Sequence, residues 1–160
     1  TQIIIPSSVT KIGKLAFNGI QTLEIIGDMR IIHDSMFNEC SSLKQITFPS
    51  VVQIGFSAFS GCSSLTQVNI PSSVTLIKSF AFRKCSSLTK ITIPSYITQI
   101  TKGTFSECSS LTQIIIPSSL TKIEEYAFYK CSSLTKIQIP PSVTQIGNYA
   151  FFGCSSLIQI

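Results

Sequence analysis

The 160-residue chain contains no tryptophan, one histidine and two methionines, and only 12% of its residues are charged. An ordinary globular domain carries about 25% charged residues. Long apolar runs are also absent: the longest, at 149–152, has four residues, whereas a membrane-spanning helix needs about 20. Apolar residues still reach 44%, so the composition does not indicate disorder. These features argue against membrane insertion and favour one domain with a sizeable core.

Dense positive charge is missing as well. The net charge of +5 comes from 12 Lys and Arg residues set against only 7 Asp and Glu residues. The basic residues are scattered, and Arg83-Lys84 is their one adjacent pair. A nucleic-acid interface needs a basic stripe, often with aromatic residues between the charges. We therefore expect no nucleic-acid partner.

The usual marks of catalysis and metal binding are absent. There is no glycine-rich phosphate loop, HExxH or DxDxDG, and no two cysteines are closer than 22 residues, whereas zinc ligands come in close pairs. His33 is followed by Asp34 and Ser35, but adjacent residues cannot orient one another as a catalytic triad requires. Glu124 and Glu125 are neighbours in a solvated turn rather than an acid and base across a cleft. We expect no enzymatic activity, catalytic residue, metal or cofactor.

The sequence does contain a repeat. Ile and Ser each occur 26 times, and each cysteine is followed by Ser-Ser-Leu. Successive cysteines are 22, 23, 23, 23 and 23 residues apart, and the prolines and phenylalanines keep the same period. From its leucine the unit reads L-x-x-I-x-I-P-S-S-V-T-x-I-x-x-x-A-F-x-x-C-S-S. The cysteines stand at Cys40, Cys62, Cys85, Cys108, Cys131 and Cys154.

The unit predicts its own local structure. The alternating apolar residues of 111–116 indicate a short strand with one buried side, and Pro117 ends its pairing because proline has no N–H. Residues 120–123 form a second short extended segment. Eight positions of each unit point inward, and one coil cannot bury them alone. The sequence therefore predicts a β-rich solenoid with a stacked parallel sheet and few or no helices.

One solenoid of about seven coils is expected over 1–160, with degenerate repeats at 1–42 and regular repeats at 43–160. Near the start, Gly27-Asp28-Met29 replaces a strand end, its proline and its turn. Solenoids normally end in polar caps, and neither end of this sequence shows one. We therefore expect the chain to be a fragment of a longer array.

Two repeated columns have structural roles in this scheme. The cysteines act as small apolar residues in a buried ladder and stay unpaired, because parallel Cβ vectors do not suit a disulfide dihedral. The Ser-Ser pairs after each cysteine stack at one corner. Their hydroxyls are expected to bond turn N–H and C=O groups of successive coils.

The pattern C-S-S-L-T-x-I-x-I-P-S-S-V-T-x-I-x-x-x-A-F resembles the BspA-like class of leucine-rich repeats, strictly over 43–160 and loosely over 2–37. This resemblance implies a curved, right-handed leucine-rich-repeat solenoid. It also implies a cell-surface or secreted protein, with adhesion to host or extracellular matrix proteins as the function. The family motif is structural, so it assigns no catalytic or binding residue to this chain.

Function is best sought on the outward side of the strands, where residues vary while the core stays fixed. We hypothesise that this sheet face binds a protein partner. Three alternatives remain open: a structural spacer without a ligand, an intracellular regulatory repeat protein, and a glycan-binding surface. The glycan reading is weakened by the absence of tryptophan and by few outward aromatic residues. The candidate residues are Gln45, Thr47, Gln67, Asn69, Lys90, Thr92, Gln113, Ile115, Lys136 and Gln138.

Overall fold

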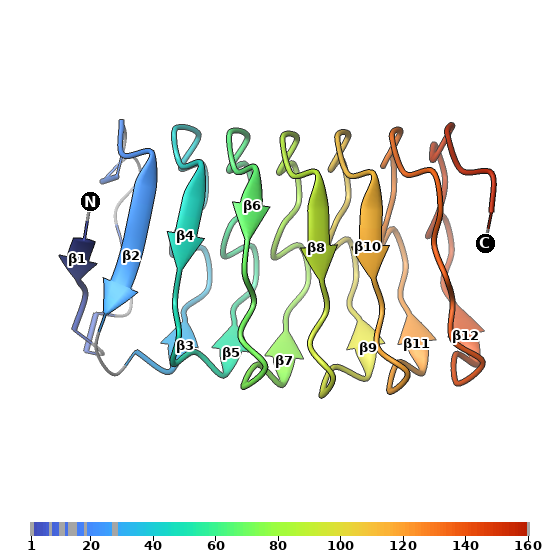
Figure 1. The fold of residues 1–160 in the computed structure, drawn as a ribbon, viewed down its shortest axis with the longest axis horizontal. Helices are drawn as coiled ribbons and strands as arrows, with labels where there is room; N and C mark the ends of the chain where they lie inside the picture. Colours follow the sequence, from blue (N-terminus) through green and yellow to red (C-terminus); the bar gives the residue numbers. More distant parts are fainter. Residues whose placement is uncertain are drawn as a thin grey trace.

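The structure is a computed structural model that describes residues 2–6, 8–9, 12, 16–17, 19–26 and 29–159. The chain winds into coils stacked along one axis, with the two termini at opposite ends (Figure 1). It descends along the near sheet, returns along the far one, and advances as a right-handed coil (Figure 1). No helix occurs among the described residues. The predicted β-rich, right-handed solenoid is confirmed.

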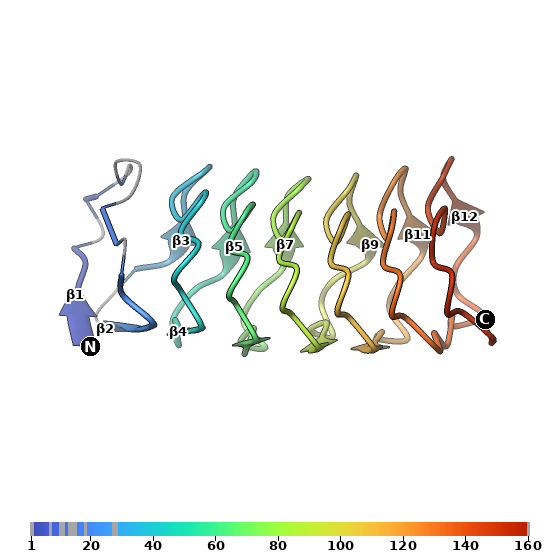
Figure 2. The same ribbon diagram turned by 90° about the horizontal axis from the view of Figure 1, so that it is seen from above.

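Two parallel sheets form opposite sides of the solenoid (Figure 2). The first sheet consists of β1 (Gln2–Ile4), β2 (Thr22–Ile26), β4 (Gln45–Thr47), β6 (Gln67–Val68), β8 (Lys90–Thr92) and β10 (Gln113–Ile115). The second sheet consists of β3 (Ile31–Ile32), β5 (Gln53–Ile54), β7 (Leu76–Ile77), β9 (Gln99–Ile100), β11 (Lys122–Ile123) and β12 (Gln145–Ile146).

The repeated apolar positions build one continuous core. In β8, Ile91 is 1% exposed, while Lys90 and Thr92 on either side are exposed. The repeated phenylalanines stack ring on ring with centroids 5.3–5.7 Å apart, because each coil places its ring above the same position of the next. The predicted inward ladder is therefore confirmed, and its stacked rings are Phe37, Phe59, Phe82, Phe105, Phe128 and Phe151.

All six cysteines are unpaired, and all but the half-buried Cys154 are buried. The Sγ of Cys108 donates to the backbone carbonyl of Phe82 over 3.1 Å. Four other cysteines make the same bond to the carbonyl of the equivalent phenylalanine. Burial raises the pKa of the Cys108 thiol to about 12. The cysteines thus behave as protonated core side chains, as the sequence predicts.

The serine prediction is only partly right. Serines that follow the cysteines make long contacts of 3.4–3.5 Å to the preceding coil. The shorter bonds come from serines that follow the prolines: Ser73, Ser119 and Ser142 donate to carbonyls of the preceding coil over 2.7, 2.8 and 2.6 Å. The stronger ladder therefore lies at the other corner, where the side chain meets an otherwise unpaired carbonyl.

Sheet pairing is interrupted on both sides of the solenoid between residues 65–87 and residues 88–110, a boundary called the seam below. The first sheet divides into β1-β2-β4-β6 and β8-β10, and the second into β3-β5-β7 and β9-β11-β12. Hydrogen bonds between the turns persist across the seam, as from Phe82 N–H to Thr104 O at 3.0 Å. At the seam, neighbouring coils are therefore joined by hydrogen bonds between their turns but not by strand pairing.

Candidate functional site

All ten candidate residues are exposed on the side of the first sheet. Seven lie in its strands, whereas Asn69 follows β6, and Lys136 and Gln138 lie in the segment beside β10. Each alternates with a buried neighbour: β4 reads exposed, buried, exposed over Gln45, Ile46 and Thr47, and β10 repeats that order. This follows from the two-residue period of a strand, because its other side is held in the core. Their predicted outward orientation is confirmed, while their role in binding stays a prediction.

Strand register places these residues in two columns. Gln45 pairs with Gln67 on β4 and β6, and Lys90 pairs with Gln113, which bridges to Lys136. In the second column Thr92 lies beside Ile115. No ladder pair joins Gln67 to Lys90, because the seam separates β6 from β8. The structure therefore divides the candidate site into two groups.

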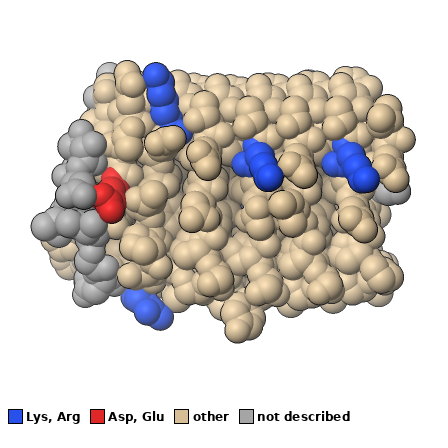
Figure 3. Space-filling view, viewed as in Figure 1, with Lys and Arg blue, Asp and Glu red and all other residues tan. Residues whose placement is uncertain are grey.

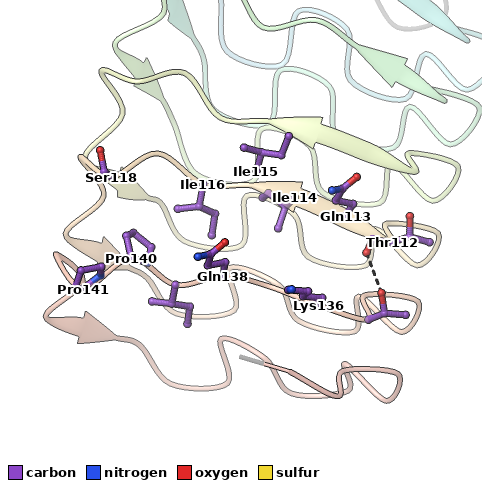
Figure 4. Close-up of a pocket in the computed structure, with 12 residues that line it drawn as sticks. Thr112, Gln113, Ile114, Ile115, Ile116, Ser118, Lys136, Gln138, Pro140 and Pro141 are labelled. Carbon is purple, nitrogen blue, oxygen red and sulfur yellow. Dashed lines mark hydrogen bonds between the residues drawn. The ribbon is translucent and has the colours of Figure 1, made fainter.

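Two of the hollows on this side of the solenoid lie where the ladder is interrupted. One, of about 560 Å³, lies at the seam and is lined by Gln67, Asn69, Lys90 and Thr92, among others. The other, of about 700 Å³, lies between β10 and residues 135–141 (Figure 4). Pairing there is reduced to the single bridge between Gln113 and Lys136. Eight of the ten candidate residues line one hollow or the other.

The second hollow combines apolar walls with a polar rim. Ile115, Ile116 and Pro140 give apolar surface, and Gln113 and Gln138 lie across the opening (Figure 4). Ile115 is 43% exposed although its equivalents Thr47, Asn69 and Thr92 are polar. Such an arrangement fits an apolar side chain flanked by hydrogen-bonding groups.

Charges are unevenly distributed around the solenoid. Over residues 43–159 the first-sheet side carries Lys44 just before β4, Lys90 on β8 and Lys136 beside β10, and no Asp or Glu. Facing this sheet, Figure 3 shows acidic side chains only next to one end. The ion pairs of the described residues lie elsewhere: Lys78–Asp34, Arg83–Glu107, Lys102–Glu125 and Lys122–Glu124, at 3.3, 3.0, 2.7 and 3.2 Å.

The acidic residues noted in the sequence have structural partners. Asp34 Oδ1 accepts the Phe56 N–H over 2.8 Å and contacts Lys78, and these bonds lower the pKa of Asp34. Glu124 accepts the Lys102 N–H over 2.9 Å. Within the described ranges, no three His, Cys, Asp or Glu side chains gather as metal ligands. No helix suited to crossing a membrane occurs in the same ranges. Asp28 lies outside the described residues.

A cluster of surface aromatic residues was missed from the sequence. Tyr126 stacks on Tyr149 with centroids 5.3 Å apart, and Tyr129 stacks on Phe152 at 5.5 Å. Tyr149 and Phe152 are 57% and 55% exposed, so the expectation of few outward aromatic residues is wrong. The two residues of each pair are 23 positions apart in the sequence, so the repeat period alone could have identified both pairs. Each stacked pair covers one face of each of its rings.

Comparisons with known proteins agree with this architecture. A family model described as BspA type leucine rich repeat region matches residues 1–51 and 30–158, in six copies. A leucine rich cell surface protein from Faecalibacterium prausnitzii A2-165 has a similar structure, with 39% identity and a TM-score of 0.84 over 98% of this chain. The match covers 46% of that protein, so this chain spans less than half its length.

Two further solved structures are similar. The T. pallidum leucine rich repeat protein is 25% identical, with a TM-score of 0.69 over 98% of this chain and 78% of its own. A leucine-rich repeat protein from Bacteroides ovatus ATCC 8483 is 29% identical, with a TM-score of 0.65 over 93% of this chain and 48% of its own. No curated protein matches the chain significantly.

Proposed function

The chain belongs to the BspA-type leucine-rich repeat family, and from that premise we propose that it is a non-enzymatic protein-binding module of a cell-surface protein. Leucine-rich repeats are consistent with a role in protein interaction, since stacked coils present an extended, rigid surface. The surface location is supported by the 39% identical Faecalibacterium prausnitzii protein, which is described as a cell surface protein. The partner class is a host or extracellular matrix protein.

One observation carries the choice of surface. The first-sheet side presents ten exposed residues in registered columns, and eight of them line the two hollows. Polar residues around a partly apolar hollow fit the anatomy of protein interfaces, which have an apolar centre and a polar rim. The second sheet presents Gln53, Gln99, Lys122 and Gln145 at equivalent strand positions. None of these residues lines either hollow, so this sheet serves as an internal control.

The test is capture followed by direct binding. The purified chain is incubated with extracellular matrix and host-cell lysate, captured proteins are identified, and the affinity of each purified one is measured. Changing Gln67, Lys90, Gln113 and Lys136 to Glu is expected to abolish binding. The control changes Gln53, Gln99 and Gln145 to Glu on the second sheet, leaves the ion-paired Lys122 in place, and is expected to bind normally.

Two outcomes would contradict the proposal. Unchanged binding by the first-sheet variant would show that the first sheet is not the binding surface. Complete absence of any direct partner would favour a structural spacer instead. Labelling of intact source cells with a membrane-impermeant reagent tests the surface location, and protection of the chain until lysis would favour an intracellular regulatory protein.

A further inference from the structure

We propose that the first sheet binds an acidic, extended segment of its protein partner, with carboxylates on Lys90 and Lys136 and an apolar side chain in the hollow beside Ile115. This inference rests on the proposed function and names the chemistry of the partner. It follows from three features of the sheet: unpaired charge, the spacing of that charge, and the adjoining apolar hollow.

The charge argument concerns which cations lack a partner. Lys44, Lys90 and Lys136 form no ion pair among the described residues, whereas four cations away from this sheet do. The acidic residues of 29–159 all lie off the first sheet. Over residues 43–159 the first-sheet side therefore carries only positive charge, whereas the other sides carry charges of both signs. Complementary charge favours a negative partner for the first-sheet side.

The spacing argument concerns Lys90 and Lys136. Both pair with Gln113 between them, so their Cα atoms are two strand spacings apart, about 10 Å. A polyproline II segment has three residues per turn with a rise of about 3.1 Å each, so residues i and i+3 project on one side about 9 Å apart. A segment lying along the solenoid axis with an acidic residue at every third position matches both lysines.

The hollow distinguishes a peptide from a polyanion. Ile115, Ile116, Ile139 and the two prolines Pro140 and Pro141 give the 700 Å³ hollow apolar walls beside Lys136 (Figure 4). A sulfated glycan or nucleic acid has no aliphatic side chain to place there. Binding of such polyanions also needs a denser basic stripe than one lysine in every second coil. An acidic peptide with apolar residues satisfies both parts of the surface.

The test uses a fluorescein-labelled peptide, (Glu-Leu-Pro)4, in which proline favours polyproline II, and anisotropy is measured as the chain is added. The expected result is saturable binding that weakens with added salt. Peptides (Gln-Leu-Pro)4 and (Glu-Ser-Pro)4 remove the charge and the apolar side chain in turn, and each is expected to bind more weakly.

Matched variants locate the contact. Lys90→Glu with Lys136→Glu is expected to weaken binding about tenfold or more, because two attractions become repulsions. Lys84→Glu with Lys130→Glu makes the same charge change, over the same two-coil interval and on exposed side chains at another edge, and is expected to leave binding within about twofold. Ile115→Thr, which keeps the residue type of Thr92 in the same column, is expected to weaken (Glu-Leu-Pro)4 binding severalfold.

Several results would overturn the inference. Equal binding of (Gln-Leu-Pro)4, or equal weakening by both lysine pairs, would remove the specific role of Lys90 and Lys136. Binding of heparin without binding of (Glu-Leu-Pro)4 would identify a polyanion surface instead. If the acidic peptide fails while a captured protein still depends on the first sheet, this inference falls and the proposed function stands. If neither the acidic peptide nor any captured protein binds the first sheet, both this inference and the proposed function are wrong.

Discussion

At the scale of the residue, the repeated cysteines show how one position is used throughout the solenoid. The Cys85 and Cys108 thiols are completely buried and donate to carbonyl oxygens of Phe59 and Phe82 over 3.2 and 3.1 Å. Removal from water disfavours the thiolate, so the pKa of Cys85 rises well above its usual value and that of Cys108 to about 12. These thiols are built for packing and not for nucleophilic chemistry.

The raised pKa makes stability depend on alkaline pH. In the unfolded chain the Cys108 thiol loses its proton near the usual value of 9.0, whereas in the folded chain it keeps it to about 12. Its contribution is therefore complete below about pH 9 and lost as pH rises toward 12, at about 1.4 kcal/mol per pH unit for one thiol. Urea unfolding from pH 7 to 10.5 is expected to show this decline, with a shallower one for Cys108→Ala. Identical slopes would contradict it.

At the scale of the element, the part of the seam on the second sheet coincides with a change in the repeat. Serine follows the Pro-Ser step at Ser73 and Ser119, but the equivalent residue at the seam is Tyr96, which is 67% exposed. The Thr98 amide makes no backbone bond to the preceding coil, whereas the equivalent amides of Thr75 and Thr121 do so at 2.9 and 2.8 Å. Thr101 partly compensates, since its Oγ1 donates to Ile77 O over 2.9 Å.

A serine in place of Tyr96 is expected to close this part of the seam. Tyr96→Ser restores a donor to the preceding coil and is expected to raise the free energy of unfolding by about 0.5–1.5 kcal/mol. Tyr96→Ala controls for loss of the ring, and Ser119→Ala is expected to lower stability by a similar amount. Urea denaturation and hydrogen exchange at the Thr98 amide measure the effect. No difference between the serine and alanine variants at 96 would contradict this account.

At the scale of the whole molecule, each coil packs mainly against its two neighbours, although the Lys78–Asp34 ion pair reaches two coils away. Stability therefore depends on every interface in turn. Phe105 lies next to the seam, is completely buried, and stacks between Phe82 and Phe128 at 5.7 Å on each side. Phe151 is only half-buried and stacks on Phe128 among the described residues. Phenylalanines at the same repeat position are therefore expected to contribute differently to the free energy of unfolding along the solenoid axis.

Truncation at these two positions tests the nearest-neighbour picture. Phe105→Ala is expected to cost about 3–5 kcal/mol and to separate unfolding into two transitions, because it removes a buried ring that packs across the seam on Phe82. Phe151→Ala is expected to cost much less and to leave one transition. Urea unfolding followed by circular dichroism and by hydrogen exchange distinguishes them. Equal losses at both positions would argue against a chain of local interfaces.

Much of this architecture was predictable because a repeated position meets its own equivalent in the next coil. The 23-residue period alone indicates which side chains face inward, where each strand ends at proline, and that the strands are parallel. It also predicts that Gln113 and Ile115 face outward on the sheet. The surface aromatic cluster was accessible in principle, since Tyr126 and Tyr149 are one period apart.

The sequence by itself determined the coil, its core ladder and the outward rows, because those features depend on a local pattern repeated along the chain. Only the tertiary structure decided where the ladders open, which lysines remain without an ion pair, and that the Ile115 hollow adjoins Lys136. Those features depend on backbone spacing between coils and on contacts between side chains up to 44 residues apart, as in the Lys78–Asp34 pair. Such contacts vary from coil to coil, so the consensus sequence of the repeat does not predict them.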